Sequence, residues 1–269
     1  MSDVVIDVKN VTIRFYMASE KIDNLKEYFV KLVKRELLFQ EFLAVKDASF
    51  QVHKGEIVGI GGLAHCGMHS LGKVCFGALK PEEGSVTVED GTIIDSPAIA
   101  MKKRVGYVSK DRDVESLCLN ASIEDNISIA GMSEFAINNF LILKNREKKY
   151  VNHQIEELSI KCAGRDQSVS QLSGGNKQKV VFGKWIGCGS EILILDCPTR
   201  GVDIGVKQAM YQLMVRLKNE GKSILMISEE LPELIGMSDR ILIMKNGEVS
   251  AEFERSETLS DAQIIEYMI

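Results

Sequence analysis

The sequence predicts an α/β fold in which a mainly parallel sheet carries helices on both faces. Residues 55–60 form a short apolar run that predicts a buried strand, and this run leads through a glycine loop into an expected helix at 67–79. A second run, residues 192–195, is wholly aliphatic and ends at Asp196, which is typical of a parallel strand buried on both faces. Strand and helix patterns alternate around these two runs, and this order favours a doubly wound sheet.

The other expected elements flank this core. Residues 4–8 and 48–52 alternate in polarity, which predicts two antiparallel strands. Residues 113–170 have a mainly helical pattern and predict a separate lobe. The remaining elements expected are strands at 85–89 and 104–108, a helix at 206–219, a strand at 223–227, a hairpin through Asn246 and Gly247, and a last helix with a capping box from Ser260 to Gln263.

Composition narrows the class of protein. The chain of 269 residues is 45% hydrophobic and 26% charged, as in an ordinary soluble globular domain, and its net charge of -5 argues against nucleic-acid binding. Its longest apolar runs, such as residues 57–63, are far shorter than the roughly 20 residues that span a bilayer. We expect no signal peptide before Val4. The six cysteines lack C-x-x-C spacing. Their pattern therefore predicts neither a zinc site nor a disulfide framework, and reduced thiols are expected.

Two segments indicate phosphate and metal chemistry. In the run 172–180, Leu-Ser-Gly-Gly-Asn-Lys-Gln-Lys-Val, two glycines follow Ser173 at an expected helix start. A hydroxyl and exposed backbone N–H groups then meet the positive end of a helix dipole, which favours a phosphate. Asp196 ends a buried strand at the edge of the sheet, where its carboxylate is a candidate Mg²⁺ ligand.

These segments, together with Pro-Thr-Arg-Gly-Val-Asp at 198–203 and the run 230–240, resemble the signature motif, Walker B strand and D-loop of ATP-binding cassette (ABC) transporters. The motifs are most similar to those of ribose- or galactose-type sugar importers, and in particular to the second, degenerate cassette of their tandem ATPase subunit. The resemblance implies a P-loop cassette with an antiparallel β subdomain. It divides a single domain, 1–269, into a core at 1–112 and 185–250, a helical lobe with the signature helix at 113–184, and a helical tail at 251–269.

The phosphate loop departs from the family pattern. Gly62 and Gly67 have the G-x-x-x-x-G spacing, but Met68 and His69 stand where a lysine for the β- and γ-phosphates and a Ser or Thr for Mg²⁺ are expected. A thioether carries no charge, and an imidazole is a poor ligand for a hard cation, so nucleotide binding should weaken. Lys73 lies about 140° around the helix from Met68 and is badly placed to substitute.

At three further positions the sequence differs from the family pattern. Cys197 replaces the glutamate that polarises water, Glu229 replaces the switch histidine, and Lys110 replaces an acidic residue of the Q-loop. With no histidine neighbour identified, we interpret Cys197 as an inert buried thiol rather than a nucleophile. Lys110 is expected to be solvated rather than to compensate the phosphates, and the same interpretation is favoured for His65 and His69.

The resemblance assigns site residues by position. Phe15 or Tyr16 matches the aromatic residue that stacks on adenine, although a core aromatic is an equally good interpretation. The candidates are, for nucleotide binding, Phe15, Tyr16, Gly62, Ala64, His65, Cys66, Gly67, Met68, His69 and Lys110; for a partner's ATP, Leu172, Ser173, Gly174, Gly175, Gln178 and Asp203; at the catalytic positions, Cys197 and Glu229; and for the metal, Asp196.

The leading hypothesis is the ATP-binding subunit, or half-subunit, of an ABC transporter for carbohydrate import on the cytoplasmic side of the membrane. ATP and Mg²⁺ are its implied cofactors, with weak or absent binding at its own site. Its implied partners are a second cassette, as a heterodimer or tandem rather than a homodimer, the transmembrane permease subunits and, indirectly, a solute-binding protein.

Three alternatives stay open. One is a pseudo-ATPase that regulates or scaffolds an assembly, and another is an autonomous ATPase with Glu229 or Glu230 as base. The third is the cassette of a polysaccharide exporter, because residues 19–41 resemble an insertion of such cassettes. This insertion is expected to form a basic amphipathic helix, on the cassette surface in preference to a membrane or partner.

Overall fold

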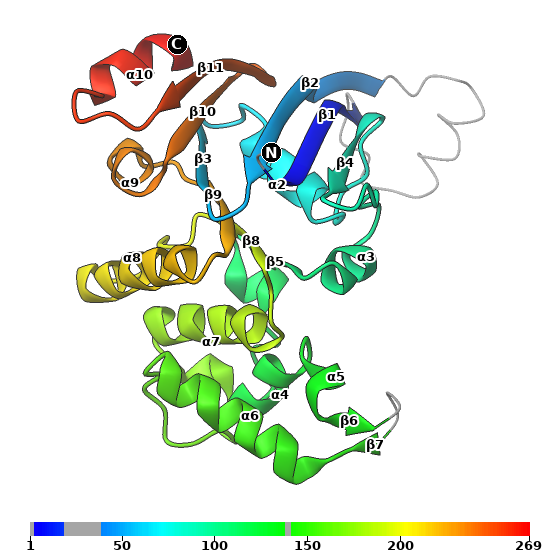
Figure 1. Ribbon diagram of the computed structural model, residues 1–269, viewed down its shortest axis with the longest axis vertical. Helices are drawn as coiled ribbons and strands as arrows, with labels where there is room; N and C mark the ends of the chain where they lie inside the picture. Colours follow the sequence, from blue (N-terminus) through cyan, green and yellow to red (C-terminus); the bar gives the residue numbers. More distant parts are fainter. Residues whose placement is uncertain (1–2, 19–38, 138–140) are drawn as a thin grey trace.

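The computed structural model describes residues 3–18, 39–137 and 141–269, and Figure 1 shows their arrangement. A six-stranded sheet runs through the centre in the order β11-β10-β3-β9-β8-β5. All neighbouring pairs are parallel except the edge pair β10 and β11. The strands are β3 (Ile57–Gly62), β5 (Val105–Val108), β8 (Ile192–Asp196), β9 (Ser223–Ile227), β10 (Arg240–Lys245) and β11 (Glu248–Glu254). This confirms the predicted fold class.

Helices cover both faces of this sheet. In Figure 1, α8 (Ile204–Asn219) and α9 (Leu231–Met237) lie on one side, and α2 (Met68–Cys75) and α3 (Pro97–Lys102) lie on the other. Every residue of β3, β8 and β9 is buried, which is why these strands are continuous apolar runs. Close packing fixes the position of α2, since a Cβ on Gly72 would come within 2.4 Å of the Ile227 side chain.

A second, antiparallel sheet has the order β2-β1-β4, with β1 at Val4–Ala18, β2 at Phe39–His53 and β4 at Glu83–Val88. The first two strands are three times as long as the predicted 4–8 and 48–52, because several register shifts interrupt the alternation of polarity. The expected helix at 19–41 lies largely outside the described residues. Its last three positions, 39–41, belong to β2 instead.

The helical lobe forms the lower end of the molecule in Figure 1. Its helices are α4 (Ile123–Ser128), α5 (Met132–Phe135), α6 (Lys144–Glu157) and α7 (Gly174–Gly187), with a π-helical turn at Arg112–Ser116 and a 3-10 turn at Val169–Gln171. A short hairpin of β6 (Ala136–Ile137) and β7 (Leu141–Ile142) also interrupts this lobe, which the helical pattern did not predict.

The chain ends in α10 (Asp261–Met268), where the predicted capping box between Ser260 and Gln263 is present. Across the part of the chain that the structure describes, no helix combines the length and the apolar character that a membrane crossing needs.

Candidate functional site

The loop between β3 and α2 has the backbone of a phosphate loop. His65 and Gly67 both have positive φ, at 67° and 100°. A Cβ on Gly67 would lie 1.9 Å from the Ala44 carbonyl oxygen, so the sequence must place glycine there. Ala64 and His65 are exposed and Cys66 is buried. The loop is therefore held against β2 while its tip faces solvent.

The two residues that follow the loop do not present a cation and a hydroxyl. The Met68 side chain is buried, with only 1% of its surface exposed. His69 points to the end of β8, where its Nδ1 lies 2.7 Å from Asp196 Oδ1. The carboxylate at the predicted metal position is thus already bound by a side chain of the same chain.

Lys110 and Glu229 complete a network around His69. Lys110 Nζ lies 2.6 Å from Glu229 Oε1 and 3.0 Å from His69 Nε2. An ammonium group only donates, so Nε2 accepts and the Nδ1–H of a neutral imidazole donates to Asp196. Donation from Lys110 holds the pKa of Glu229 below its usual value. Within the chain, Lys110 thus neutralises Glu229, and His69 gives the Asp196 carboxylate a hydrogen-bond donor.

Asp196 is fully buried and has a second partner. The hydroxyl of Tyr107 donates to Asp196 Oδ2 over 3.3 Å, so the two carboxylate oxygens face different groups. Burial, reinforced by the charge of Asp196, raises the pKa of this tyrosine and keeps its proton in place as a donor.

Cys197 is also buried and has a positive φ of 49°. Burial and the nearby charges of Asp196 and Glu229 raise the pKa of its thiol to about 12. The thiol is thus neutral near pH 7 and supplies no carboxylate for activating water. However, its Sγ, the Asp196 carboxylate and a His69 ring nitrogen all lie within 4.8 Å of one another. His69 is therefore a neighbour of Cys197 that the sequence did not identify.

Two further expectations need correction. Lys110 and His69 were interpreted as solvated, but both are partly buried and bound to charged partners. His65 is exposed, as predicted. Lys73 pairs with Glu115 at 2.6 Å, which agrees with its predicted position away from the phosphate loop.

A small cavity of about 210 Å³ lies beside this network. Phe15 and Phe42 line it, together with the loop residues and the charged side chains of the network. Phe15 lines the cavity and Tyr16 does not, so Phe15 is the better placed of the two predicted aromatics. Phe42, which sequence reasoning missed as a site residue, pairs with Phe15 across β1 and β2. An aromatic residue at the start of β2 is the signal that could have identified it.

Residues 172–180, the predicted signature segment, include the start of α7. Ser173 is the exposed N-cap residue, and its hydroxyl makes no capping bond to the helix backbone but accepts one from Asn176 Nδ2 at 2.9 Å. A Cβ on Gly175 would lie 2.5 Å from Val206 at the start of α8, so glycine permits a close approach there. The first N–H groups of α7 are consequently available to an anion.

Other predicted signature residues have internal contacts. Leu172 and Gln178 are buried, and the Gln178 amide oxygen accepts a hydrogen bond from Arg112. The same guanidinium donates to the carbonyls of Arg200 and Gly201 and so ties the D-loop to the π-helical turn. Asp203 caps α8 by accepting from the backbone N–H of Val206.

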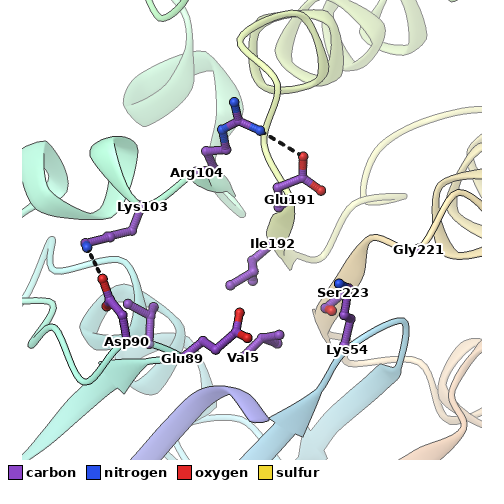
Figure 2. Close-up of a pocket in the computed structure, with 11 residues that line it drawn as sticks. Val5, Lys54, Glu89, Asp90, Lys103, Arg104, Glu191, Ile192, Gly221 and Ser223 are labelled. Carbon is purple, nitrogen blue, oxygen red and sulfur yellow. Dashed lines mark hydrogen bonds and ion pairs between the residues drawn. The ribbon is translucent and has the colours of Figure 1, made fainter. Parts of the chain in front are cut away.

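A larger cavity, about 600 Å³, lies elsewhere (Figure 2). It opens at the N-terminal ends of β5, β8 and β9, opposite the edge that carries Asp196. Four of its charged groups form ion pairs, Lys103 with Asp90 and Arg104 with Glu191. None of the predicted site residues lines this cavity, and ligands of open α/β sheets bind at the other edge.

Comparison with known proteins agrees with this geometry. A family model described as ABC transporter matches residues 45–200, a span that contains the phosphate loop, the signature segment and the Walker B strand. The chain belongs to the ABC transporter family. The cassette is 40% identical over 226 residues to the ribose import ATP-binding protein RbsA of Clostridium tetani, and 42% identical over 217 residues to that of Bacillus subtilis.

These matches cover 84% and 80% of the cassette, but only 45% and 44% of the relatives, so the cassette spans a little under half their length. Solved structures support the fold. The dimeric cassette MJ0796 bound to ADP and Pi superposes with a TM-score of 0.74 at 19% identity, over 93% of this chain and 99% of that one. A nucleotide-free cassette gives 0.73 at 21% identity, over 99% of both.

Proposed function

We propose that this cassette is the non-hydrolysing member of a pair of ABC cassettes in a sugar importer. It would lend its signature segment to the ATP site of the partner cassette, while its own site binds nucleotide weakly or not at all. Two regions of the chain differ in a way that supports this proposal. The positions that bind and hydrolyse ATP are tied into an internal network, whereas the N-terminus of α7 is open.

The chemistry of phosphoryl transfer supports this asymmetry. Transfer to water needs cations around the γ-phosphate and a group that orients the attacking water. Here Met68 is neutral and buried, Cys197 is a neutral thiol, and the ammonium of Lys110 is already bound to Glu229. A partner cassette with an intact lysine and glutamate would therefore supply the hydrolysis.

The names and lengths of the relatives support a proposal for the wider transporter assembly. The curated relatives are named as ribose import proteins and are about twice as long as this cassette. We therefore propose a tandem or heterodimeric arrangement at the cytoplasmic side of the membrane, with permease subunits and, indirectly, a solute-binding protein as partners. A pentose or a similar sugar is the proposed cargo.

The test mixes this cassette with a partner cassette of the same transporter and measures phosphate release. We expect the mixture to hydrolyse ATP at least about tenfold faster than the partner alone, because removing one transition-state donor costs about 10²–10³ in rate. Ser173→Arg should abolish the gain by filling the anion site. Ser256→Arg, at an exposed serine between β11 and α10, is the matched control. Equal rates with and without this cassette would contradict the proposal.

One observation favours a second candidate, a pseudo-ATPase that scaffolds or regulates an assembly. Glu229 is paired with Lys110 and Asp196 accepts a hydrogen bond from His69, so both carboxylates have partners without a nucleotide. Equilibrium binding of labelled ATP, with and without Mg²⁺, separates the two. Binding without turnover supports the asymmetric pair, and no binding at millimolar ATP, together with no effect on a partner, supports the scaffold.

An autonomous ATPase is disfavoured by the same contacts. Glu229 is bound to Lys110, and Glu230 forms an ion pair with Lys207. Neither carboxylate is placed as a free base for water.

A further inference from the structure

Three different donor atoms converge where β8 ends. The ring of His69 comes from the first turn of α2, and Asp196 and Cys197 come from the end of β8 and the residue after it. A nitrogen of the histidine, an oxygen of the aspartate and the sulfur of the cysteine lie within 4.8 Å of one another. Asp196 and Cys197 are buried and His69 is half-buried, so this cluster is not an exposed acidic patch.

We propose that His69, Asp196 and Cys197 form a site for a divalent transition cation of the Zn²⁺ type. This inference goes beyond the proposed function, since it concerns an ion other than Mg²⁺ and does not require nucleotide. Nitrogen, sulfur and carboxylate ligands suit Zn²⁺, whereas Mg²⁺ requires an octahedral shell of oxygen. Zn²⁺ bonds of about 2.0–2.3 Å place tetrahedral ligand atoms roughly 3.5 Å apart, so the three donor atoms, which lie within 4.8 Å of one another, would move closer together around the ion.

The surrounding groups match the outer contacts of such a site. The Tyr107 hydroxyl binds Asp196 Oδ2, which leaves Oδ1 for a cation. On the far side of the imidazole, His69 Nε2 lies 3.4 Å from Glu229 Oε1. Ligating histidines commonly donate their second ring N–H to a carboxylate, which fixes the ring and its tautomer. Glu229 is placed for that role.

The proposed network has two states, one with the hydrogen bonds of the structure and one with a bound cation. Without a cation, the Nδ1–H of His69 donates to Asp196 while Nε2 accepts from Lys110. With a cation on Nδ1, the ring proton moves to Nε2 and is donated to Glu229, which Lys110 continues to bind. The thiol of Cys197 loses its proton to solvent, and the two negative ligands balance the charge of the cation. One proton is released for each cation bound.

The probe for this site is Co²⁺, which takes Zn²⁺ sites and reports its ligands by absorption. The full chain, stripped with chelator, is titrated with Co²⁺ and then with Zn²⁺ in competition. We expect a thiolate-to-cobalt charge-transfer band, intense d–d bands of four-coordinate geometry, and their loss when Zn²⁺ is added. Mg²⁺ at a hundredfold excess over Co²⁺ should leave the bands in place.

Variants assign the ligands. Cys197→Ser should remove the charge-transfer band, and His69→Gln should weaken Co²⁺ binding at least about 100-fold. Glu229→Gln should weaken it about 10–100-fold, as expected for an outer-shell partner. The matched controls are Cys118→Ser, an exposed cysteine, and His153→Ala, an exposed histidine of α6, and both should keep the bands.

Thermal unfolding makes the test independent of the spectrum. Zn²⁺ should raise the Tm of the unsubstituted chain and of both control variants, but not that of Cys197→Ser. The proposal is overturned by a spectrum of six-coordinate Co²⁺ without a thiolate band, by a band that persists in Cys197→Ser, or by displacement of Co²⁺ with Mg²⁺. If the Cys197→Ser chain does not fold, retention of full affinity in His69→Gln overturns it as well.

Discussion

At the scale of single residues, the ion pair between Lys110 and Glu229 is the main feature of the candidate site. Glu229 lies at the predicted switch position and Lys110 in the predicted Q-loop, and the two side chains bind each other at 2.6 Å. Glu229 without Lys110 would add an unpaired negative charge to that of Asp196. Because the pair forms, Glu229 is neutralised without a nucleotide and Lys110 is not free to bind a phosphate, which is the physical basis of the proposed loss of hydrolysis.

This pair predicts a pH-dependent effect on stability. The pKa of Glu229 is lowered mainly by the Lys110 hydrogen bond, so the stabilisation is present above its ordinary pKa near 4.5 and is lost as the pH falls through the lower folded value. Since Glu229 is 44% exposed, Lys110→Met should cost less than about 1 kcal/mol at pH 7. The difference should shrink as the pH falls through that lowered pKa and vanish once Glu229 is protonated in both the folded and the unfolded state.

Urea unfolding over a series of pH values measures this effect. Lys54→Met, at an exposed lysine of the opposite sheet edge, serves as the control and should show no such profile. A cost that is constant from pH 7 down to pH 3 would show that Lys110 acts through packing rather than through its charge.

At the scale of elements, the loop at 62–67 has the backbone of a phosphate loop, although Met68 and His69 follow it in place of the expected lysine and hydroxyl. Gly67 has a φ of 100° and sits against the Ala44 carbonyl of β2, and Gly62 packs against Cys66 and β10. The loop therefore fastens α2 to the two sheets, a role that does not depend on ATP. This explains how the loop can persist in a site that we propose to be inactive.

Gly67→Ala should consequently destabilise the fold by about 3 kcal/mol or more, through both the positive φ and the backbone clash. Gly236→Ala in α9 is the matched control, because no atom lies within 4 Å of its added Cβ, and it should be neutral or stabilising. Chemical denaturation of the two variants checks this. Equal stability of Gly67→Ala and the unsubstituted chain would mean that the loop readily moves away from Ala44.

The sequence predicted strands well where both faces of the strand are buried, and poorly where they are not. The run 223–227 was predicted with its observed bounds, because a wholly buried strand is a continuous apolar segment. The ends of β1 and β2 were missed, since bulges break their alternation. The family resemblance placed His69, Asp196, Cys197 and Glu229 near one site. It could not predict the hydrogen bonds between them, which depend on side-chain directions from separate elements.

At the scale of the whole molecule, we propose that the two halves of an ABC site are uncoupled within one chain. The signature segment and Asp203 lie at the starts of α7 and α8, while the altered positions cluster where β3, β8 and β9 end. In the head-to-tail pair that we propose, these two regions would face different nucleotides. A chain can therefore lose one function and keep the other, which makes an asymmetric pair physically reasonable.

Restoring the family residues tests this view of the whole site. Met68→Lys alone should improve ATP binding little and should cost stability, because it places an ammonium in a buried position beside a closed network. The quadruple change Met68→Lys, His69→Ser, Lys110→Glu and Glu229→His opens that network and should raise Mg·ATP affinity at least about tenfold, since it returns the phosphate cation and the Mg²⁺ hydroxyl.

The effects should thus be strongly non-additive, as expected for residues that share one network. Isothermal titration with Mg·ATP measures them, and the same four changes in a chain that also carries Ser173→Arg should bind equally well. Additive single effects would show that the altered positions act independently. Loss of binding with Ser173→Arg would place the signature segment in the chain's own site, contrary to the uncoupling of the two halves.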